Sequence, residues 1–259
     1  MNVEKINPNV LLAGSSNSLY GTECNTPLSC HQDKGMSSLC LNHSKLQFIT
    51  HYNSKYSYIH SAQLALEGGC RWIQLRMKQA DNALLEETAV LVQKLCKAYG
   101  ATFIIDDHVW LAQKIHADGV HLGKNDMPVA QAKKLLGKGY IIGSTVNSFT
   151  DIQQILQTAT PDYFGCGPFR FTTTKQQLAP ILGVEGYQNI LTNMKANNIH
   201  IPLVAIGGIS KADIAPLLAC GVHGIALSGS VLNANNPVQE MNETKSIIFN
   251  NHLTNTLKK

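Results

Sequence analysis

Eight short apolar segments, rich in Val, Ile and Phe, alternate with segments of helical periodicity in this chain of 259 residues. The strand-like segments cover residues 46–52, 71–77, 102–107, 119–123, 140–146, 162–168, 201–208 and 224–230. Strands separated by helices pair in parallel, because each helix returns the chain to the same edge of the sheet. Eight such units predict a closed (β/α)8 barrel, the TIM barrel, whose usual length is ~200 to 250 residues.

An open, doubly wound sheet is the alternative for alternating strands and helices. Such sheets often carry a Gly-rich loop after the first strand. Here the first predicted strand is followed by residues 53–58, Asn-Ser-Lys-Tyr-Ser-Tyr, without a glycine. The sequence therefore favours a single closed barrel.

Capping residues mark the starts of several predicted helices. Asp81 precedes the longest one, residues 82–98, and Ser210 precedes another; both residue types cap helix N-termini. Pro128 suits the first turn of a third helix. Two neighbouring apolar stripes run along the longest helix: Leu84, Thr88, Leu91 and Leu95, and beside them Leu85, Ala89, Val92 and Cys96.

Residues 1–45 differ in composition from the rest of the chain. They are rich in Asn, Ser, Cys and Gly and lack the periodicity that follows. We interpret residues 1–45 as a poorly ordered N-terminal extension and residues 46–252 as one catalytic barrel domain. None of the seven cysteines has CxxC spacing, so we expect reduced thiols rather than a zinc site or disulfides.

Charge and hydropathy narrow the class of partner. A formal net charge of +4 is mild and favours small anions, whereas nucleic-acid binding would require a dense basic stripe. The apolar runs are too short to span a membrane, and the first residues do not resemble a secretory signal. We expect a cytoplasmic protein that acts on small molecules and binds neither nucleic acid nor membrane, with its oligomeric state open.

Polar residues gather at the ends of seven predicted strands. In (β/α)8 barrels the C-terminal strand ends form the active site. In chain order these residues are Gln74, Arg76 and Lys78; Asp106 and Asp107; Lys124, Asn125 and Asp126; Ser144 and Thr145; Thr172, Thr173, Thr174 and Lys175; Gly207 and Gly208; and Ser228, Gly229 and Ser230. Their common position predicts one large polar site.

The second strand alternates polar and apolar side chains. Because successive side chains point to opposite faces, the segment divides into two sets: Trp72, Gln74, Arg76 and Lys78, and Ile73, Leu75 and Met77. We expect the apolar set to meet the helices and the polar set to point towards the barrel mouth. A solvated edge strand is the alternative, but a closed barrel has no edge. Buried cations need anions, and a diphosphate is a suitable partner.

Two aspartates follow neighbouring strands. Asp107 and Asp126 supply hard oxygen ligands of the kind that Mg²⁺ prefers, and Mg²⁺ would bridge them to phosphate oxygens. The alternative for Asp107 is a structural cap of the helix that starts near His108. The nearby cations and Asp126 together favour the metal site.

The loops after strands 6, 7 and 8 predict a second anion site. Hydroxyls and an ammonium group are present in residues 172–175, and glycines follow strands 7 and 8, where many barrels bind phosphate through backbone amides. One site suits a diphosphate and the other a monophosphate. Together they suggest a reaction that joins two phosphorylated substrates and releases pyrophosphate.

Six motifs, in their order and spacing, resemble the thiamine phosphate synthase family over residues 46–250. The motifs are QLRMK (74–78), FIIDD (103–107), ADGVHLGKND (117–126), GPFRFTTTK (167–175), AIGGI (205–209) and ALSGS (226–230). The resemblance implies a compact (β/α)8 barrel that uses Mg²⁺. It implies condensation of 4-amino-5-hydroxymethyl-2-methylpyrimidine diphosphate with a thiazole phosphate, carboxylated or not, to thiamine phosphate and pyrophosphate. It also implies that pyrophosphate leaves first and that the thiazole nitrogen captures the resulting carbocation.

The same resemblance implies roles for individual residues. The pyrimidine diphosphate would be held by Gln74, Arg76, Lys78, Asp106, Thr145 and Lys175; Mg²⁺ by Asp107 and Asp126; and the thiazole phosphate by Thr172, Thr173, Thr174, Gly208, Ser228 and Gly229. Three positions depart from the family. Asp106 replaces a common Asn, Thr145 replaces a frequent Ser, and Ser228-Gly229 replaces a frequent aliphatic residue followed by Ser. The extra carboxylate leaves the role of position 106 open, whereas the other two changes keep the hydroxyl or the backbone contacts.

Three other functions are compatible with such a barrel. A thiazole tautomerase of the same superfamily would not need the full set of cations and metal ligands. A Schiff-base aldolase or sugar-phosphate isomerase would use Lys78 or Lys175. A non-catalytic barrel would only bind thiazole phosphate.

Overall fold

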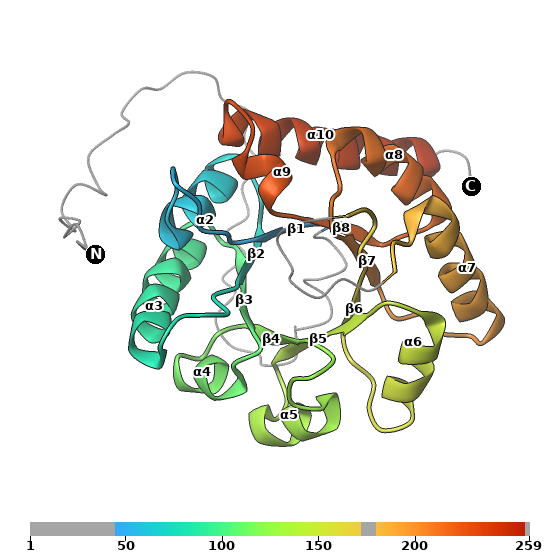
Figure 1. The fold of residues 1–259 in the computed structure, drawn as a ribbon, viewed down its shortest axis with the longest axis horizontal. Coiled ribbons are helices and arrows are strands. Elements are labelled where there is room, and N and C mark those ends of the chain that lie inside the picture. Colours follow the sequence, from blue (N-terminus) through green and yellow to red (C-terminus); the bar gives the residue numbers. More distant parts are fainter. Residues whose placement is uncertain (1–44, 172–179, 257–259) are drawn as a thin grey trace, which may run out of the picture. The chain divides into compact units, whose positions relative to one another are not determined.

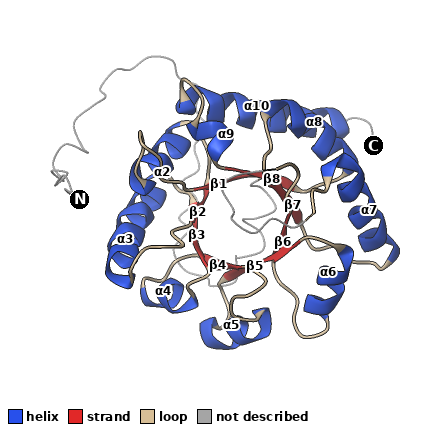
Figure 2. Ribbon diagram, viewed as in Figure 1, coloured by secondary structure: helices blue, strands red, loops and turns tan. Residues whose placement is uncertain are grey.

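The computed structural model describes residues 45–171 and 180–256, which form a closed barrel of eight parallel strands inside a ring of helices (Figures 1 and 2). The strands are β1 (Leu46–Ile49), β2 (Trp72–Leu75), β3 (Thr102–Asp106), β4 (Gly119–Leu122), β5 (Ile141–Val146), β6 (Tyr163–Cys166), β7 (Leu203–Ile206) and β8 (Gly224–Leu227). Each strand pairs with the next, and β8 pairs with β1. The predicted (β/α)8 barrel is confirmed.

The helices follow the strands in strict alternation up to β8. They are α2 (Tyr58–Glu67), α3 (Asn82–Ala98), α4 (Val109–Lys114), α5 (Val129–Leu136), α6 (Phe149–Leu156), α7 (Gly183–Ala196), α8 (Lys211–Cys220), α9 (Gly229–Leu232) and α10 (Pro237–Thr256). Within the described residues no helix is long and apolar enough to cross a membrane.

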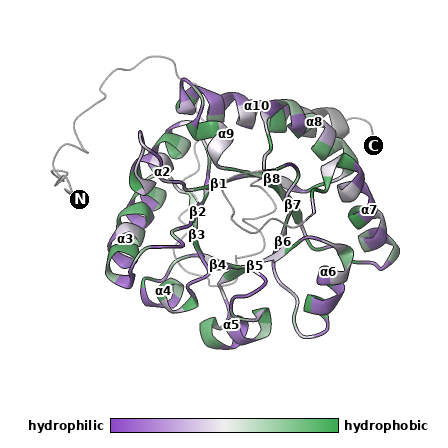
Figure 3. Cartoon of the chain, viewed as in Figure 1, coloured by the Kyte–Doolittle hydropathy of each residue, from purple (hydrophilic) through white to green (hydrophobic). Residues whose placement is uncertain are grey.

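Two separate apolar regions hold the barrel together. Inside it, a small cluster includes Trp72, Ile104, Tyr163 and Val204. Between the strands and the helices lies a much larger cluster, to which the outward residues of the strands and the inward residues of the helices contribute. Each helix of the ring therefore has to be amphipathic, and both hydrophobic and hydrophilic stretches are visible on the helices in Figure 3.

Capping residues fix the starts of the predicted helices. The Asp81 carboxylate accepts a hydrogen bond from Leu84 N at 2.9 Å at the start of α3. Ser210 is the N-cap of α8, and its backbone N and hydroxyl both donate to Asp213 Oδ2, at 2.9 and 2.6 Å. Both predicted N-cap positions are confirmed, whereas Pro128, predicted in the first turn, lies at the N-cap of α5, one residue before the helix.

The structure corrects several details of the sequence interpretation. The strands are shorter than the apolar segments, because residues at the segment ends, such as Thr50, Arg76 and Gly207, lie outside the sheet. The loop expected at Gly229 and Ser230 is the short helix α9. On α3 the stripe that includes Leu85 is buried, whereas Leu84 and Leu91 are 47% and 39% exposed. The interpretation of residues 1–45 as an extension falls, except for Lys45, outside the described residues, and the domain boundaries stay predictions.

Candidate active site

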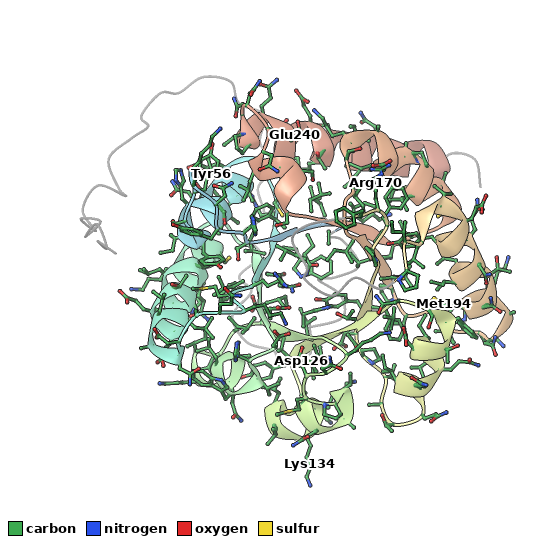
Figure 4. All side chains as sticks on the ribbon, viewed as in Figure 1. Tyr56, Asp126, Lys134, Arg170, Met194 and Glu240 are labelled. Atoms are coloured by element: carbon green, nitrogen blue, oxygen red, sulfur yellow. The ribbon has the colours of Figure 1, made fainter. Side chains whose placement is uncertain are left out.

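A cavity of about 730 Å³ opens at the C-terminal end of the barrel strands. Its lining comes from the ends of β1 to β8 and from loops after them, including α9. Figure 4 shows Asp126, in the loop after β4, and Arg170, in the loop after β6, on opposite sides of the barrel axis. The predicted polar residues in the described part of the chain that line this cavity are Gln74, Arg76, Lys78, Asp106, Asp107, Lys124, Asn125, Asp126, Thr145, Gly207, Gly208, Ser228, Gly229 and Ser230.

Asp106 lies at the centre of a cluster of cations and amide donors from β2 and the residues just after it. Its Oδ1 accepts a hydrogen bond from Gln74 Nε2 at 2.7 Å. Its Oδ2 lies 3.6 Å from Arg76 Nε and 3.5 Å from Lys78 Nζ. Burial raises the pKa of Asp106 and the charge of Asp126 adds to this effect, while Lys78 and Arg76 oppose it. The predicted alternation of strand 2 is confirmed, because its polar side chains face the barrel mouth.

A pair of carboxylates faces this cluster. Asp107 and Asp126 converge beside Gly123: a Cβ built on that glycine would lie 2.6 Å from Asp126 Oδ2 and 3.9 Å from Asp107 Oδ1. Burial raises the pKa of Asp126, and its neighbour Asp107 raises it further. Asp107 also forms an ion pair with Lys78. Two carboxylates so close together favour the binding of a cation.

Asp107 does not cap the helix that follows it. The N-cap of α4 is His108, and no side-chain hydrogen bond caps this helix. Asp107 has a left-handed backbone with φ of 63°, which turns its side chain towards the cavity lining. Its buried Oδ1 has no hydrogen-bond partner among the described residues. The capping alternative is therefore wrong.

The carboxylate pair suits a Mg²⁺ ion that takes its remaining ligands from water and substrate, rather than a metal bound only by protein side chains. Within residues 45–171 and 180–256 no group of three or more His, Cys, Asp or Glu side chains is arranged to hold a metal. Protein sites for Mg²⁺ commonly use one or two carboxylates and complete the octahedron with water and substrate phosphates. Asp107 and Asp126, with the unpartnered oxygen of Asp107, match that donor set.

Backbone groups line the opposite side of the cavity. Gly207 and Gly208 have φ of 95° and 68°, which L side chains rarely adopt, so glycine is required at this turn. Arg170 holds the turn from outside: Nη1 donates to Gly208 O at 3.0 Å, and the guanidinium forms a bidentate pair with Asp213 at 2.8 Å. Hydrogen bonds from Arg170 hold the pKa of Asp213 at about 2. Ser228 Oγ, also in the lining, is buried and lacks a partner in the described part of the chain.

Four predicted residues lie outside the described part of the chain: Thr172, Thr173, Thr174 and Lys175. Phe171, which precedes them, lines the cavity and is 63% exposed. Their roles stay predictions.

The sequence analysis did not identify two residues of functional interest, His121 and Tyr163. His121 of β4 lines the cavity, and its Nε2 lies 2.9 Å from Thr145 Oγ1. Its Nδ1 lies 3.0 Å from the hydroxyl of the fully buried Tyr163. The alternation of β4 carries the signal, because Val120 and Leu122 pack outward and leave the residue between them facing inward.

Comparison with known proteins decides the family. The family model described as thiamine monophosphate synthase matches residues 46–231. This chain belongs to the thiamine monophosphate synthase family.

Relatives of the thiamine monophosphate synthase family match along almost their whole length. The chain is 60% identical to the thiamine-phosphate synthase of Phocaeicola vulgatus over 76% of this chain and 94% of that protein. It is 54% identical to the thiamine-phosphate synthase of Bacteroides fragilis, over 78% of this chain and 98% of that protein. A solved structure of a thiamine phosphate pyrophosphorylase from Pyrococcus furiosus superposes on this chain with a TM-score of 0.72. The two sequences are 34% identical, and the match covers 82% of this chain and 98% of that one.

Proposed function

We propose that this chain is a Mg²⁺-dependent thiamine-phosphate synthase. It transfers the pyrimidinylmethyl group of 4-amino-5-hydroxymethyl-2-methylpyrimidine diphosphate to the nitrogen of 4-methyl-5-(2-phosphooxyethyl)thiazole, or of its carboxylated form. The products are thiamine phosphate and pyrophosphate. Family membership and 60% identity to a thiamine-phosphate synthase support the transfer.

One observation carries the substrate assignment. A set of donors, Gln74, Arg76 and Lys78, faces a pair of convergent carboxylates, Asp107 and Asp126, across one wall of the cavity. A bare cation cluster would suit any anion, and a bare carboxylate pair any cation. The two together suit a diphosphate that carries its own divalent metal.

The barrier of the reaction comes from charge separation, and the site lowers this barrier by stabilising the separated charges. The C–O bond to the pyrimidine methylene breaks, and its electron pair leaves with pyrophosphate. The thiazole nitrogen then donates its lone pair to the electron-deficient carbon and forms the C–N bond. Arg76 and Lys78 stabilise the charge that builds on the leaving oxygens, because they are already in place before the bond breaks.

Asp107 and Asp126 would hold the metal. When bound, Mg²⁺ neutralises part of the diphosphate charge and improves it as a leaving group. Asp106 holds the donors in position: it accepts a hydrogen bond from Gln74 Nε2 and pairs with Arg76 and Lys78. Asp106 therefore orders these donors, and the substrate diphosphate would take its place against Arg76 and Lys78.

The thiazole phosphate would bind on the other side of the cavity. Gly208, Ser228 and Gly229 supply backbone groups there, and the unpartnered Ser228 Oγ, as judged within the described chain, adds a hydroxyl. The hydroxyls of residues 172–174 would complete this site, and Lys175 would reach the diphosphate. The enzyme would act in the cytoplasm on these small phosphorylated substrates.

The rival functions have less support. A tautomerase has no use for the paired cations and carboxylates described above. A Schiff base on Lys78 requires a neutral amine. Burial lowers the pKa of Lys78, but the charges of Asp106 and Asp107 outweigh this effect and raise it overall, so the amine stays protonated.

The test is a pyrophosphate-release assay with both substrates, with each one omitted, and with EDTA in place of Mg²⁺. Release that requires both substrates and the metal supports the synthase. Binding of thiazole phosphate without release would support a non-catalytic barrel. Release without the thiazole phosphate would indicate a hydrolase and overturn the proposal.

A further inference from the structure

A chain of hydrogen bonds crosses the barrel interior and ends at the cavity. Gln47 Nε2 of β1 lies 3.4 Å from the hydroxyl of Tyr163 in β6. That hydroxyl lies 3.0 Å from His121 Nδ1 in β4, and His121 Nε2 lies 2.9 Å from Thr145 Oγ1 in β5. Gln47, Tyr163 and His121 are buried, at 2%, 0% and 8% exposure, whereas Thr145 lines the cavity.

The chemistry of the groups gives this chain a direction. An amide nitrogen only donates, so Tyr163 accepts from Gln47. Burial raises the pKa of Tyr163, so the phenol keeps its one proton, which is then available for His121 Nδ1. A neutral imidazole that accepts at Nδ1 carries its proton at Nε2 and donates to Thr145 Oγ1. The proton of Thr145 is thereby directed away from His121.

Two glycines make room for the two rings. A Cβ at Gly143 would lie 2.2 Å from Tyr163 Cζ, and a Cβ at Gly165 would lie 2.8 Å from His121 Cε1. Trp72 packs edge-on against Tyr163, with ring centroids 4.9 Å apart. The two rings are therefore closely packed in the positions that join β1 to β5.

We propose that Gln47, Tyr163 and His121 are positioning residues that fix the hydroxyl of Thr145 as a hydrogen-bond donor to an oxygen of the pyrimidine diphosphate. The inference rests on the proposed function. Oxygens of a diphosphate only accept hydrogen bonds, so a hydroxyl that points its proton into the cavity suits the leaving group. Thr145 is the residue that contacts the substrate.

The tautomer of His121 tests the direction of the chain without any substrate. We expect ¹⁵N NMR of the full-length protein to show His121 protonated at Nε2 and bare at Nδ1. The chain has 10 histidines, and the signal is assigned by its loss in His121→Asn. Tyr163→Phe should abolish the single tautomer. An Nδ1-protonated ring or an imidazolium in the wild type would overturn the proposal, whatever the enzyme's activity.

A double-mutant cycle tests whether Tyr163 acts through Thr145. We expect Tyr163→Phe and Thr145→Val each to lower kcat/KM for the pyrimidine diphosphate about tenfold, the effect of one lost hydrogen bond. The double variant should be no worse than either single one, and KM for the thiazole phosphate should not change. Multiplying losses would overturn the proposal.

A second buried tyrosine provides the control. Tyr187 is fully buried and donates to Cys166 O at 2.5 Å, without a part in the chain from Gln47 to Thr145. Tyr187→Phe should lower the urea midpoint as Tyr163→Phe does and leave the His121 tautomer intact. A tautomer disturbed equally by both variants would reduce Tyr163 to a structural role. Because the tautomer is measured without substrate, failure of this inference and failure of the proposed synthase activity are distinguishable.

Discussion

Asp106 is an anion placed between the two cations that we assign to the substrate diphosphate. The carboxylate competes with the substrate for Arg76 and Lys78, whose donor atoms lie 3.6 and 3.5 Å from Asp106 Oδ2. Asp106→Asn removes the charge, introduces the residue common in the family, and keeps an oxygen that accepts from Gln74. We expect this variant to bind the pyrimidine diphosphate more tightly.

The distances set the size of the effect. For each pair, Coulomb's law gives about 4 to 5 kcal/mol at ~3.5 Å and an effective dielectric constant of ~20. The side chains of Arg76 and Lys78 are 23% and 42% exposed, so water screens much of this attraction. With about 0.5 to 1 kcal/mol for each screened pair, removing both gives ~1 to 2 kcal/mol, or roughly a 5- to 30-fold lower KM.

Steady-state kinetics at saturating thiazole phosphate and Mg²⁺ measure this KM. The gain should shrink as salt is raised, because exposed ion pairs are screened. Asp118→Asn is the matched control: Asp118 precedes β4, at the strand end away from the cavity, and its Oδ2 accepts from Phe103 N at 2.7 Å. That variant should lose stability without a change in KM. A KM for Asp106→Asn that stays equal or rises would refute the idea of competition.

Three further substitutions test other parts of the site. Arg76→Ala should raise KM for the pyrimidine diphosphate about 10- to 100-fold, the effect of a lost charge-assisted bond, and spare the thiazole phosphate; equal losses would contradict two separate sites. Asp107→Asn should raise the Mg²⁺ concentration for half-maximal activity ~10- to 100-fold, and unchanged metal dependence would exclude Asp107 as a ligand. Gly143→Ala should cost about 1 to 3 kcal/mol in urea unfolding, because the added Cβ meets the Tyr163 ring; an unchanged midpoint would show that the ring has room to move.

The sequence predicts the barrel well because its alternation is repeated eight times. Strand 2 is informative in more detail, since its strict alternation is enough to separate Gln74 and Arg76 from Ile73 and Leu75. The exposed side of α3 is harder to predict. Leu84 and Leu85 both belong to apolar stripes of helical spacing, and only the packing of α3 against the barrel determines which one is buried.

The site is predictable where charged residues end a strand and less so where a residue acts through a partner. Asp107 and Asp126 stand out in the sequence as oxygen ligands. His121 and Tyr163 read as ordinary strand residues, because their partners, Thr145 and Gln47, lie on other strands and become neighbours only when the barrel closes. The capping alternative for Asp107 also could not be decided from the sequence. Its place before a helix suggests a cap, whereas its left-handed backbone directs the side chain to the cavity.

Calorimetric titration with pyrophosphate tests most directly whether the carboxylate pair and the cation cluster form one site for a metal-bound diphosphate. We expect saturable binding of one pyrophosphate per chain in Mg²⁺, little or none in EDTA, and clear weakening in both Arg76→Ala and Asp107→Asn. Equal binding with and without Mg²⁺, or binding that neither substitution weakens, would contradict the assignment.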